Sequence, residues 1–159
     1  MVEMRVWRLA LDERTDTPVV VLQEVNGKRV LPIWIGRAEA RAIAMELAGQ
    51  KFQRPLTHDL TKTLIEALDG AVRKIDITEL RENTFFAKLF IEKGDEIIGI
   101  DARPSDSIAL ALKTGSPVFV AEDLLREQSS VEMSEDERAE ALRRYLDEMN
   151  PEDFGKFPL

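Results

Sequence analysis

The feature that most constrains the fold is a repeat of secondary-structure order within the chain. Expected strands over residues 5–11, 18–25 and 29–35 lead to an expected helix over 37–48. The same order returns about 65 residues later, with strands over 71–80, 84–91 and 96–101 and a helix over 104–113. Apolar positions correspond between the halves: Ile33 with Ile98, Ile35 with Ile100, Ile43 with Ile108, and Leu47 with Leu112. The sequence therefore predicts an α+β fold with a duplicated β-β-β-α unit and mostly antiparallel strands.

Turn and helix signals complete this expectation. Asn26-Gly27 indicates a two-residue hairpin, and Pro32 indicates an edge strand, because proline donates no ladder hydrogen bond. Between the halves, a helix over 57–68 is expected to begin with Thr57 as its N-cap. Its leucines, spaced by four, are expected to face inward: Leu60, Leu64 and Leu68. A strand over 117–120 and a short helix over 122–126 follow.

The chain of 159 residues is long enough for one domain, which we place at residues 1–127. Residues 128–159 differ because they form an acidic tail, with one helix expected over about 135–149. Its capping pattern begins at Ser134, and its apolar side is Ala139, Leu142, Leu146 and Met149. Such a tail can contact its own domain, a sister subunit or a protein partner.

Composition excludes several kinds of chemistry. With no cysteine, the chain has no disulfide, thiolate nucleophile or Cys-ligated metal, and its single histidine is His58. The net charge of −8 does not favour tight, general binding of nucleic acid. The N-terminus carries no apolar targeting run, so we expect a cytoplasmic protein with no membrane contact.

Charged residues gather at two strand-to-helix corners, residues 54–59 and 101–106. Each corner places an arginine, suited to a phosphate, beside carboxylates at a helix start. Carboxylates next to a phosphate favour a bridging Mg²⁺ or Mn²⁺, and His58 could transfer a proton. The same residues also suit ordinary helix starts and structural salt bridges.

The residues of these corners resemble the signatures of a known family. Leu31-Pro-Ile-Trp-Ile-Gly36, Glu39-Ala40 and Arg54-Pro-Leu-Thr-His-Asp-Leu60 resemble its first signature. Asp101-Ala-Arg-Pro-Ser-Asp-Ser-Ile-Ala-Leu110 resembles its second. This is the bifunctional nuclease (BFN domain) family, and the resemblance covers about residues 1–127. It implies an α+β domain, a homodimer or other homo-oligomer, and activity on DNA and RNA.

The resemblance also implies candidate site residues, to which we assign roles by their chemistry. His58, Asp59 and Asp106 are the expected catalytic residues, and Arg54, Arg103 and Ser105 the expected substrate-binding residues. Asp59, Asp101 and Asp106, with Glu39, are the expected ligands of Mg²⁺ or Mn²⁺. Ser107 stands where many relatives have alanine.

Three interpretations remain open from the sequence. The chain is a metal-dependent nuclease, or a non-catalytic oligomeric module that binds a small anionic ligand or protein partner. In the third interpretation the charged corners are structural, and Arg–Asp pairs join the two halves or two subunits.

Overall fold

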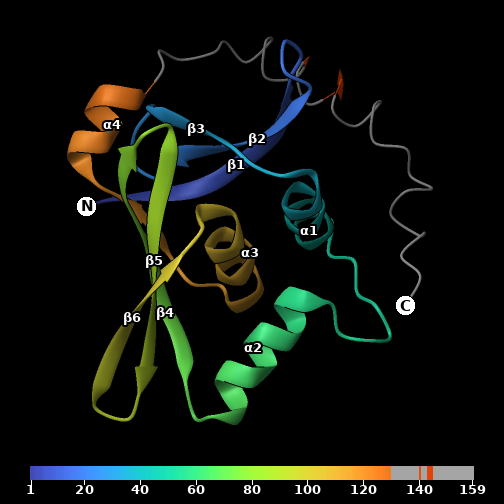
Figure 1. Cartoon of the computed structure of the whole chain (residues 1–159), viewed down its shortest axis with the longest axis vertical. Helices are drawn as coiled ribbons and strands as arrows, with labels where there is room; N and C mark the ends of the chain where they lie inside the picture. Colours follow the sequence, from blue (N-terminus) through green and yellow to red (C-terminus); the bar gives the residue numbers. More distant parts are fainter. Residues whose placement is uncertain (130–139, 141–142, 145–159) are drawn as a thin grey trace.

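The computed structural model describes residues 1–129, 140, 143 and 144, and its centre is one seven-stranded sheet (Figure 1). The strand order is β3-β2-β1-β7-β4-β5-β6. The strands are β1 (Val2–Asp12), β2 (Thr17–Glu24), β3 (Val30–Trp34), β4 (Ala71–Arg81), β5 (Thr84–Lys93), β6 (Glu96–Ala102) and β7 (Val118–Val120). The helices are α1 (Arg37–Leu47), α2 (Thr57–Ala67), α3 (Pro104–Thr114) and α4 (Glu122–Gln128).

Each half of the chain contributes three consecutive antiparallel strands followed by a helix. The predicted α+β class and the repeated β-β-β-α order are therefore confirmed. The short strand β7 joins the halves, since it pairs antiparallel with β1 and parallel with β4. The sequence predicted this strand but not its position at the middle of the sheet.

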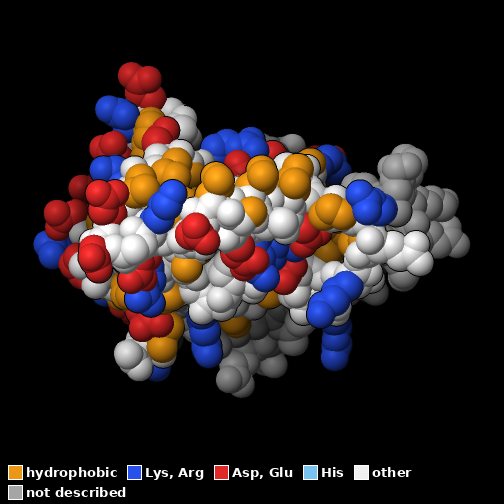
Figure 2. Space-filling view, turned by 90° about the horizontal axis from the view of Figure 1, so that it is seen from below, with side chains coloured by type: hydrophobic (Ala, Val, Ile, Leu, Met, Phe, Trp, Pro, Cys, Tyr) orange, Lys and Arg blue, Asp and Glu red, His pale blue; other side chains and the backbone are white. Residues whose placement is uncertain are grey.

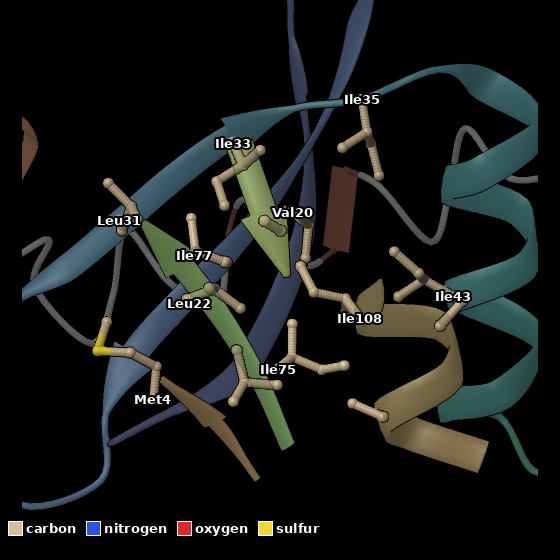
Figure 3. Close-up of a cluster of buried hydrophobic side chains, with 14 of the residues drawn as sticks. Met4, Val20, Leu22, Leu31, Ile33, Ile35, Ile43, Ile75, Ile77 and Ile108 are labelled. Atoms are coloured by element: carbon tan, nitrogen blue, oxygen red, sulfur yellow. The ribbon is translucent and has the colours of Figure 1, made fainter. Parts of the chain in front are cut away.

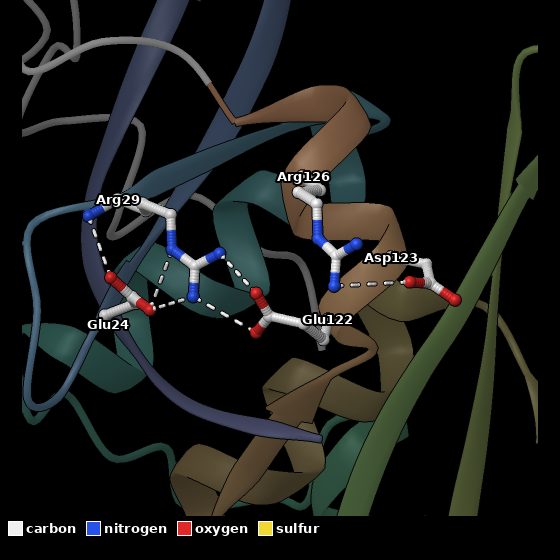
Figure 4. Close-up of polar contacts among 5 residues, drawn as sticks. All are labelled: Glu24, Arg29, Glu122, Asp123 and Arg126. Atoms are coloured by element: carbon white, nitrogen blue, oxygen red, sulfur yellow. Dashed lines mark hydrogen bonds and ion pairs between the residues drawn. The ribbon is translucent and has the colours of Figure 1, made fainter.

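The edge position of β3 is also confirmed, because β3 pairs with β2 alone and Pro32 lies within it. The predicted two-residue hairpin at Asn26-Gly27 is wrong in length, since β2 ends at Glu24 and β3 begins at Val30. The Glu24 N–H closes this longer loop by donating to the Arg29 carbonyl at 3.0 Å. The Arg29 guanidinium holds the loop in place by binding Glu24 at 2.6 Å and Glu122 of α4 at 2.8 Å (Figure 4).

The core lies between the sheet and the helices α1, α3 and α4. Side chains from both halves meet there, among them Leu22, Leu31, Ile33, Ile43, Ile75, Ile77 and Ile108 (Figure 3). Ile43 of α1 and Ile108 of α3, which correspond in the repeat, are both fully buried. Burying such a side chain stabilises the fold by about 1.5–3 kcal/mol. The packing of α1 beside α3 brings the two halves of the chain together.

Two predictions about the helices are wrong. Leu60, Leu64 and Leu68 were expected to face inward, but they are 49%, 54% and 67% exposed, and α2 has no buried residue. Ile65, on another side of α2, packs against the core instead. Thr57 is the first helical residue and not the N-cap, because the N-cap is Leu56.

Of the tail helix expected over about 135–149, only residues 140, 143 and 144 are described, so this helix stays a prediction. None of the helices in the described part of the chain is long and apolar enough to cross a membrane.

Ser107 provides a test of the core packing. Its side chain is completely buried in α3, and its hydroxyl has no hydrogen-bond partner in the described part of the protein. An unsatisfied buried hydroxyl costs on the order of 1 kcal/mol or more, and alanine favours a helix more than serine does. We therefore expect Ser107→Ala to raise the melting temperature by about 3 °C, measured by calorimetry.

Ser116→Ala is the matched control. The Ser116 hydroxyl donates to the Val72 carbonyl at 2.9 Å, so its removal should lower the melting temperature. A Ser107→Ala protein less stable than wild type would show that the buried hydroxyl has a partner.

Candidate active site at the start of three helices

The candidate site forms where α1, α2 and α3 meet on one side of the sheet (Figure 1). Each helix has a carboxylate in its first turn: Glu39 in α1, Asp59 in α2 and Asp106 in α3. Carboxylates are favoured there because they face the positive end of the helix dipole. Pro104 occupies the first position of α3, where its fixed backbone angle suits a helix start.

A continuous chain of polar contacts links all three helices through Asp106. His58 Nε2 lies 2.9 Å from Asp106 Oδ1, and Arg103 Nε donates to Asp106 Oδ2 at 2.8 Å. Arg103 also forms an ion pair with Glu39 at 3.0 Å. The His58 and Glu39 side chains are only 14% and 18% exposed, whereas that of Arg103 is 65% exposed. The two charged corners predicted from the sequence, residues 54–59 and 101–106, therefore meet at the Asp106 carboxylate.

A second set of contacts centres on the Lys113 ammonium near the end of α3. Lys113 Nζ lies 2.6 Å from Asp59 Oδ1 and 2.7 Å from Glu46 Oε2. The other Asp59 oxygen accepts the Leu56 N–H at 2.9 Å, which fixes the start of α2. Lys113 thus holds α1 and α2 against α3.

These contacts shift the ionisation of the groups that form them. Burial disfavours the charged form of Asp106, but hydrogen bonds from Arg103 and His58 outweigh it and lower the pKa. Burial is likewise outweighed at Asp59, where Lys113 and the Leu56 N–H lower the pKa. Burial opposes the charge of Lys113, yet its bonds to Asp59 and Glu46 raise its pKa. The two carboxylates and the ammonium are therefore charged at neutral pH.

A pocket of about 560 Å³ opens between α1 and α2, beside these contacts. His58, Asp59 and Lys113 line it, together with Lys51 and Lys62. A smaller pocket, of about 360 Å³, lies next to Arg103 and Ser105 and includes Trp34. The His58–Asp106–Arg103 contacts connect residues of both pockets.

Comparison with known proteins places this architecture in a family. The family model described as the bifunctional nuclease domain matches residues 20–133. The chain belongs to the bifunctional nuclease domain family. An uncharacterized protein of Mycobacterium tuberculosis is 41% identical over 97% of this chain and 98% of its own length. Bifunctional nuclease 1 of Oryza sativa subsp. japonica is 28% identical over 73% of this chain and 36% of its own. Bifunctional nuclease 1 of Arabidopsis thaliana is 26% identical over 65% of this chain and 33% of its own length.

The bifunctional nuclease domain brings together five of the eight residues predicted from its sequence. Glu39, His58, Arg103 and Asp106 form one polar chain, and Ser105 is buried in the first turn of α3 beside Arg103. Asp59 lines the same pocket as His58 but is bonded to Lys113 and Leu56.

The other two predicted residues lie outside these contacts. Asp101 is an exposed residue of β6, paired in register with Lys88 of β5. Arg54 is exposed and forms no ion pair with a described residue. Arg54 is therefore available to an external anion.

The predicted metal ligands do not form a metal site in this arrangement. Within residues 1–129, 140, 143 and 144, no three Asp, Glu or His side chains are grouped so that they could hold a metal ion. Asp106 is occupied by His58 and Arg103, Asp59 by Lys113, and Glu39 by Arg103. The donor set does not fit Mg²⁺ or Mn²⁺ as it stands, so we derive no step through a metal.

Sequence reasoning missed Lys113 and Glu46. A signal was present, because Lys113 follows Asp106 by seven residues and Glu46 follows Glu39 by seven. Seven residues are about two helical turns, so each pair lies along one side of its helix. Two such rows of charge on neighbouring helices would have predicted the contact between Lys113 and Glu46, whereas the contact of Lys113 with Asp59 depends on where α2 packs.

The lowered pKa of Asp106 predicts a specific dependence of stability on acid. Because ionisation favours the folded state, this contribution is present above the ordinary aspartate pKa of 3.8 and is lost as pH falls below it. We expect wild type to be more stable than Asp106→Asn at pH 6, and the difference to shrink between pH 4 and pH 2.5. Urea unfolding across this range measures it.

Asp95→Asn, in the exposed turn between β5 and β6, is the matched control and should show no such convergence. A constant difference between wild type and Asp106→Asn over the whole range would contradict the assignment.

Proposed function

We propose that this bifunctional nuclease domain hydrolyses phosphodiester bonds of DNA and RNA in the pocket between α1 and α2. The observation that carries the proposal is the His58–Asp106 pair beside a pocket that Lys51, Lys62 and Lys113 also line. The names of the plant relatives support the same reaction class. The net charge of −8 restricts any nucleic-acid contact to local cations such as these.

The hydrogen bond between His58 and Asp106 defines the proposed role of the imidazole. Because an ionised Asp106 can only accept, it selects the His58 tautomer that donates from Nε2–H, and that tautomer leaves Nδ1 without a proton. That nitrogen can accept a proton from a water molecule as the water attacks phosphorus. The Asp106 carboxylate stabilises the imidazolium that forms, and Arg103 keeps the carboxylate in place. The proton can then pass to the leaving oxygen as the P–O bond breaks.

Substrate binding is assigned to cations that form no ion pair with a residue of the described part of the chain. Lys51 lines the pocket, and Arg54 is exposed three residues later. Both precede α2, whose first N–H groups also favour an anion. We propose that Lys51 and Arg54 hold the phosphate, whereas Lys113, already bonded to two carboxylates, holds the helices.

Metal dependence is a separate part of the proposal. A metal would polarise the phosphate and activate water, but binding it at Asp59, Asp101 and Asp106 would require the present ion pairs to break. Assays with Mg²⁺, Mn²⁺ or EDTA, beside an Asp101→Asn variant, test this part directly.

A binding module without catalysis is the second candidate. The pocket favours it because its lysines suit an anion while its carboxylates are already paired. In that case a nucleotide would raise the melting temperature and remain intact.

We expect purified protein to cleave labelled single-stranded DNA and RNA, and His58→Gln and Asp106→Asn to lose at least about 100-fold in rate. Asp95→Asn should cleave at the wild-type rate, and circular dichroism should confirm that every variant is folded. Cleavage at equal rates in His58→Gln would contradict the assigned mechanism. Binding without cleavage in wild type would replace the nuclease with the binding module.

A further inference from the structure

One exposed aromatic side chain, that of Trp34, has no part in the proposed chemistry. Trp34 is 49% exposed at the end of the edge strand β3. Figure 2 shows hydrophobic side chains in a row across the surface seen from below. In the described part of the chain, however, every other exposed large hydrophobic residue is a valine, leucine, isoleucine or methionine. Trp34 differs from them because an aromatic ring offers a π-face on which a planar ligand can stack.

Trp34 lines the smaller of the two pockets, of about 360 Å³. Four segments supply this pocket, which we call the Trp34 pocket: β3 contributes Trp34, the turn before β5 contributes Asn83, β5 contributes Phe85, and the start of α3 contributes Arg103 and Ser105. Small-ligand sites typically combine aromatic rings with a few polar groups in this way. The lining therefore suits a flat ligand that carries hydrogen-bonding groups.

The indole ring is held in place before any ligand binds. Its Nε1–H donates to Asp12 Oδ2 at 2.9 Å, and Asp12 is the last residue of β1. This hydrogen bond lowers the pKa of Asp12 below its ordinary value, so the accepting carboxylate is ionised at neutral pH. A side chain that is already fixed loses less conformational freedom on binding, which favours affinity.

The Trp34 pocket lies next to the proposed catalytic pair. Arg103, which lines the pocket and is 65% exposed, donates from Nε to Asp106 at 2.8 Å. The other oxygen of Asp106 lies 2.9 Å from His58 Nε2. Only two side chains thus separate the pocket from the imidazole. A nucleotide next to a phosphate held beside His58 could therefore place its base in the Trp34 pocket.

Base stacking also fits the charge of this chain. A net charge of −8 does not favour binding through phosphates alone. Stacking on an aromatic ring requires no positive charge, and it tolerates any base because every base has a π-face. The Asn83 side-chain amide adds one donor and one acceptor group at the pocket, which can pair with the edge of a base.

We propose that the Trp34 pocket binds an unpaired base of a single-stranded nucleic acid, stacked on the indole ring. The proposal rests on the proposed function for the position of the neighbouring phosphate beside His58. It names single strands of DNA or RNA as the substrate class, because the bases of a duplex are paired and stacked on one another and cannot enter a pocket without being flipped out. Trp34 is then a substrate-binding residue that positions the strand.

Binding measurements with three labelled, phosphorothioate-linked probes of equal length test the proposal. The first is a single strand, the second is the same strand in a duplex, and the third is an abasic strand, which keeps the phosphates and lacks the bases. We expect wild type to bind the single strand at least about 5-fold more tightly than either other probe. Trp34→Ala should bind the single strand as weakly as the abasic strand, whereas Trp34→Phe should keep most of the preference.

Leu60→Ala is the matched control for Trp34→Ala. Leu60 has the same exposure of 49% but lines neither pocket, so this variant should bind all three probes as wild type does.

Tryptophan fluorescence provides a second measurement that leaves Trp34 in place, and so decides the question even if Trp34→Ala fails to fold. The sequence has two tryptophans, Trp7 and Trp34, so Trp34 is the only one in Trp7→Phe. The single strand should quench its emission, and the abasic strand should leave the emission unchanged.

The outcomes separate this proposal from the nuclease proposal. Equal affinity of wild type for the single strand and the abasic strand, with unchanged Trp34 emission, would overturn the base site and leave the phosphate chemistry standing. A preference for bases that Trp34→Ala retains would also overturn it, as would tighter binding of the duplex. The expected preference without cleavage of ordinary strands would support the base site and contradict the nuclease. If wild type binds none of the probes, the base site is overturned, and the cleavage assay decides the nuclease proposal by itself.

Discussion

The candidate site depends on one carboxylate that is shared by two partners from different parts of the chain. Asp106 accepts one hydrogen bond from Arg103 in its own corner and interacts with His58 of α2. Arg103 extends the contact to Glu39 of α1. The ionised carboxylate lies 2.9 Å from His58 Nε2 and so holds the only histidine of the sequence in position.

The arrangement of the sheet brings these side chains from the two halves of the chain together. The strand β7 lies between β1 and β4, so the two halves form one sheet and α1 packs against α3. The Lys113 ammonium then binds Asp59 and Glu46, which holds α2 at the end of the helix pair. The charged residues therefore have a structural role as well as the proposed catalytic one. Since the Arg103 side chain is 65% exposed, its ion pairs stabilise the fold less than fully buried pairs would.

Local signals in the sequence were sufficient to predict the order of elements. Apolar periodicity predicted the strands and helices, and Pro32 predicted the edge position of β3. The central place of β7 could not be predicted, because a strand of three residues contains no information about its neighbours. The leucine stripe of α2 was predicted to be buried because amphipathic helices usually cover their own core. Within the described part of the chain that stripe is exposed, and Ile65 on another side of α2 packs against the core instead.

The sequence was sufficient to predict which residues form the candidate site, but it predicted only some of the contacts between them. Arginine and aspartate at two helix starts predicted the corners, but the His58–Asp106 contact spans 48 positions and depends on helix packing. The predicted metal ligands included Asp101 together with Asp59 and Asp106, because all three lie in the sequence motifs. In the structure Asp101 is instead an exposed residue of β6, opposite Lys88. Contacts between separate helices decide these arrangements, and a single sequence does not define them.

Nitrogen NMR of His58 tests the central claim most directly, because the only histidine gives one unambiguous pair of ring signals. With Asp106 as partner, we predict that neutral His58 carries its proton on Nε2, and that Asp106→Asn loses this preference while the fold persists. A proton on Nδ1 in wild type, or the same tautomer balance in both proteins, would contradict the account.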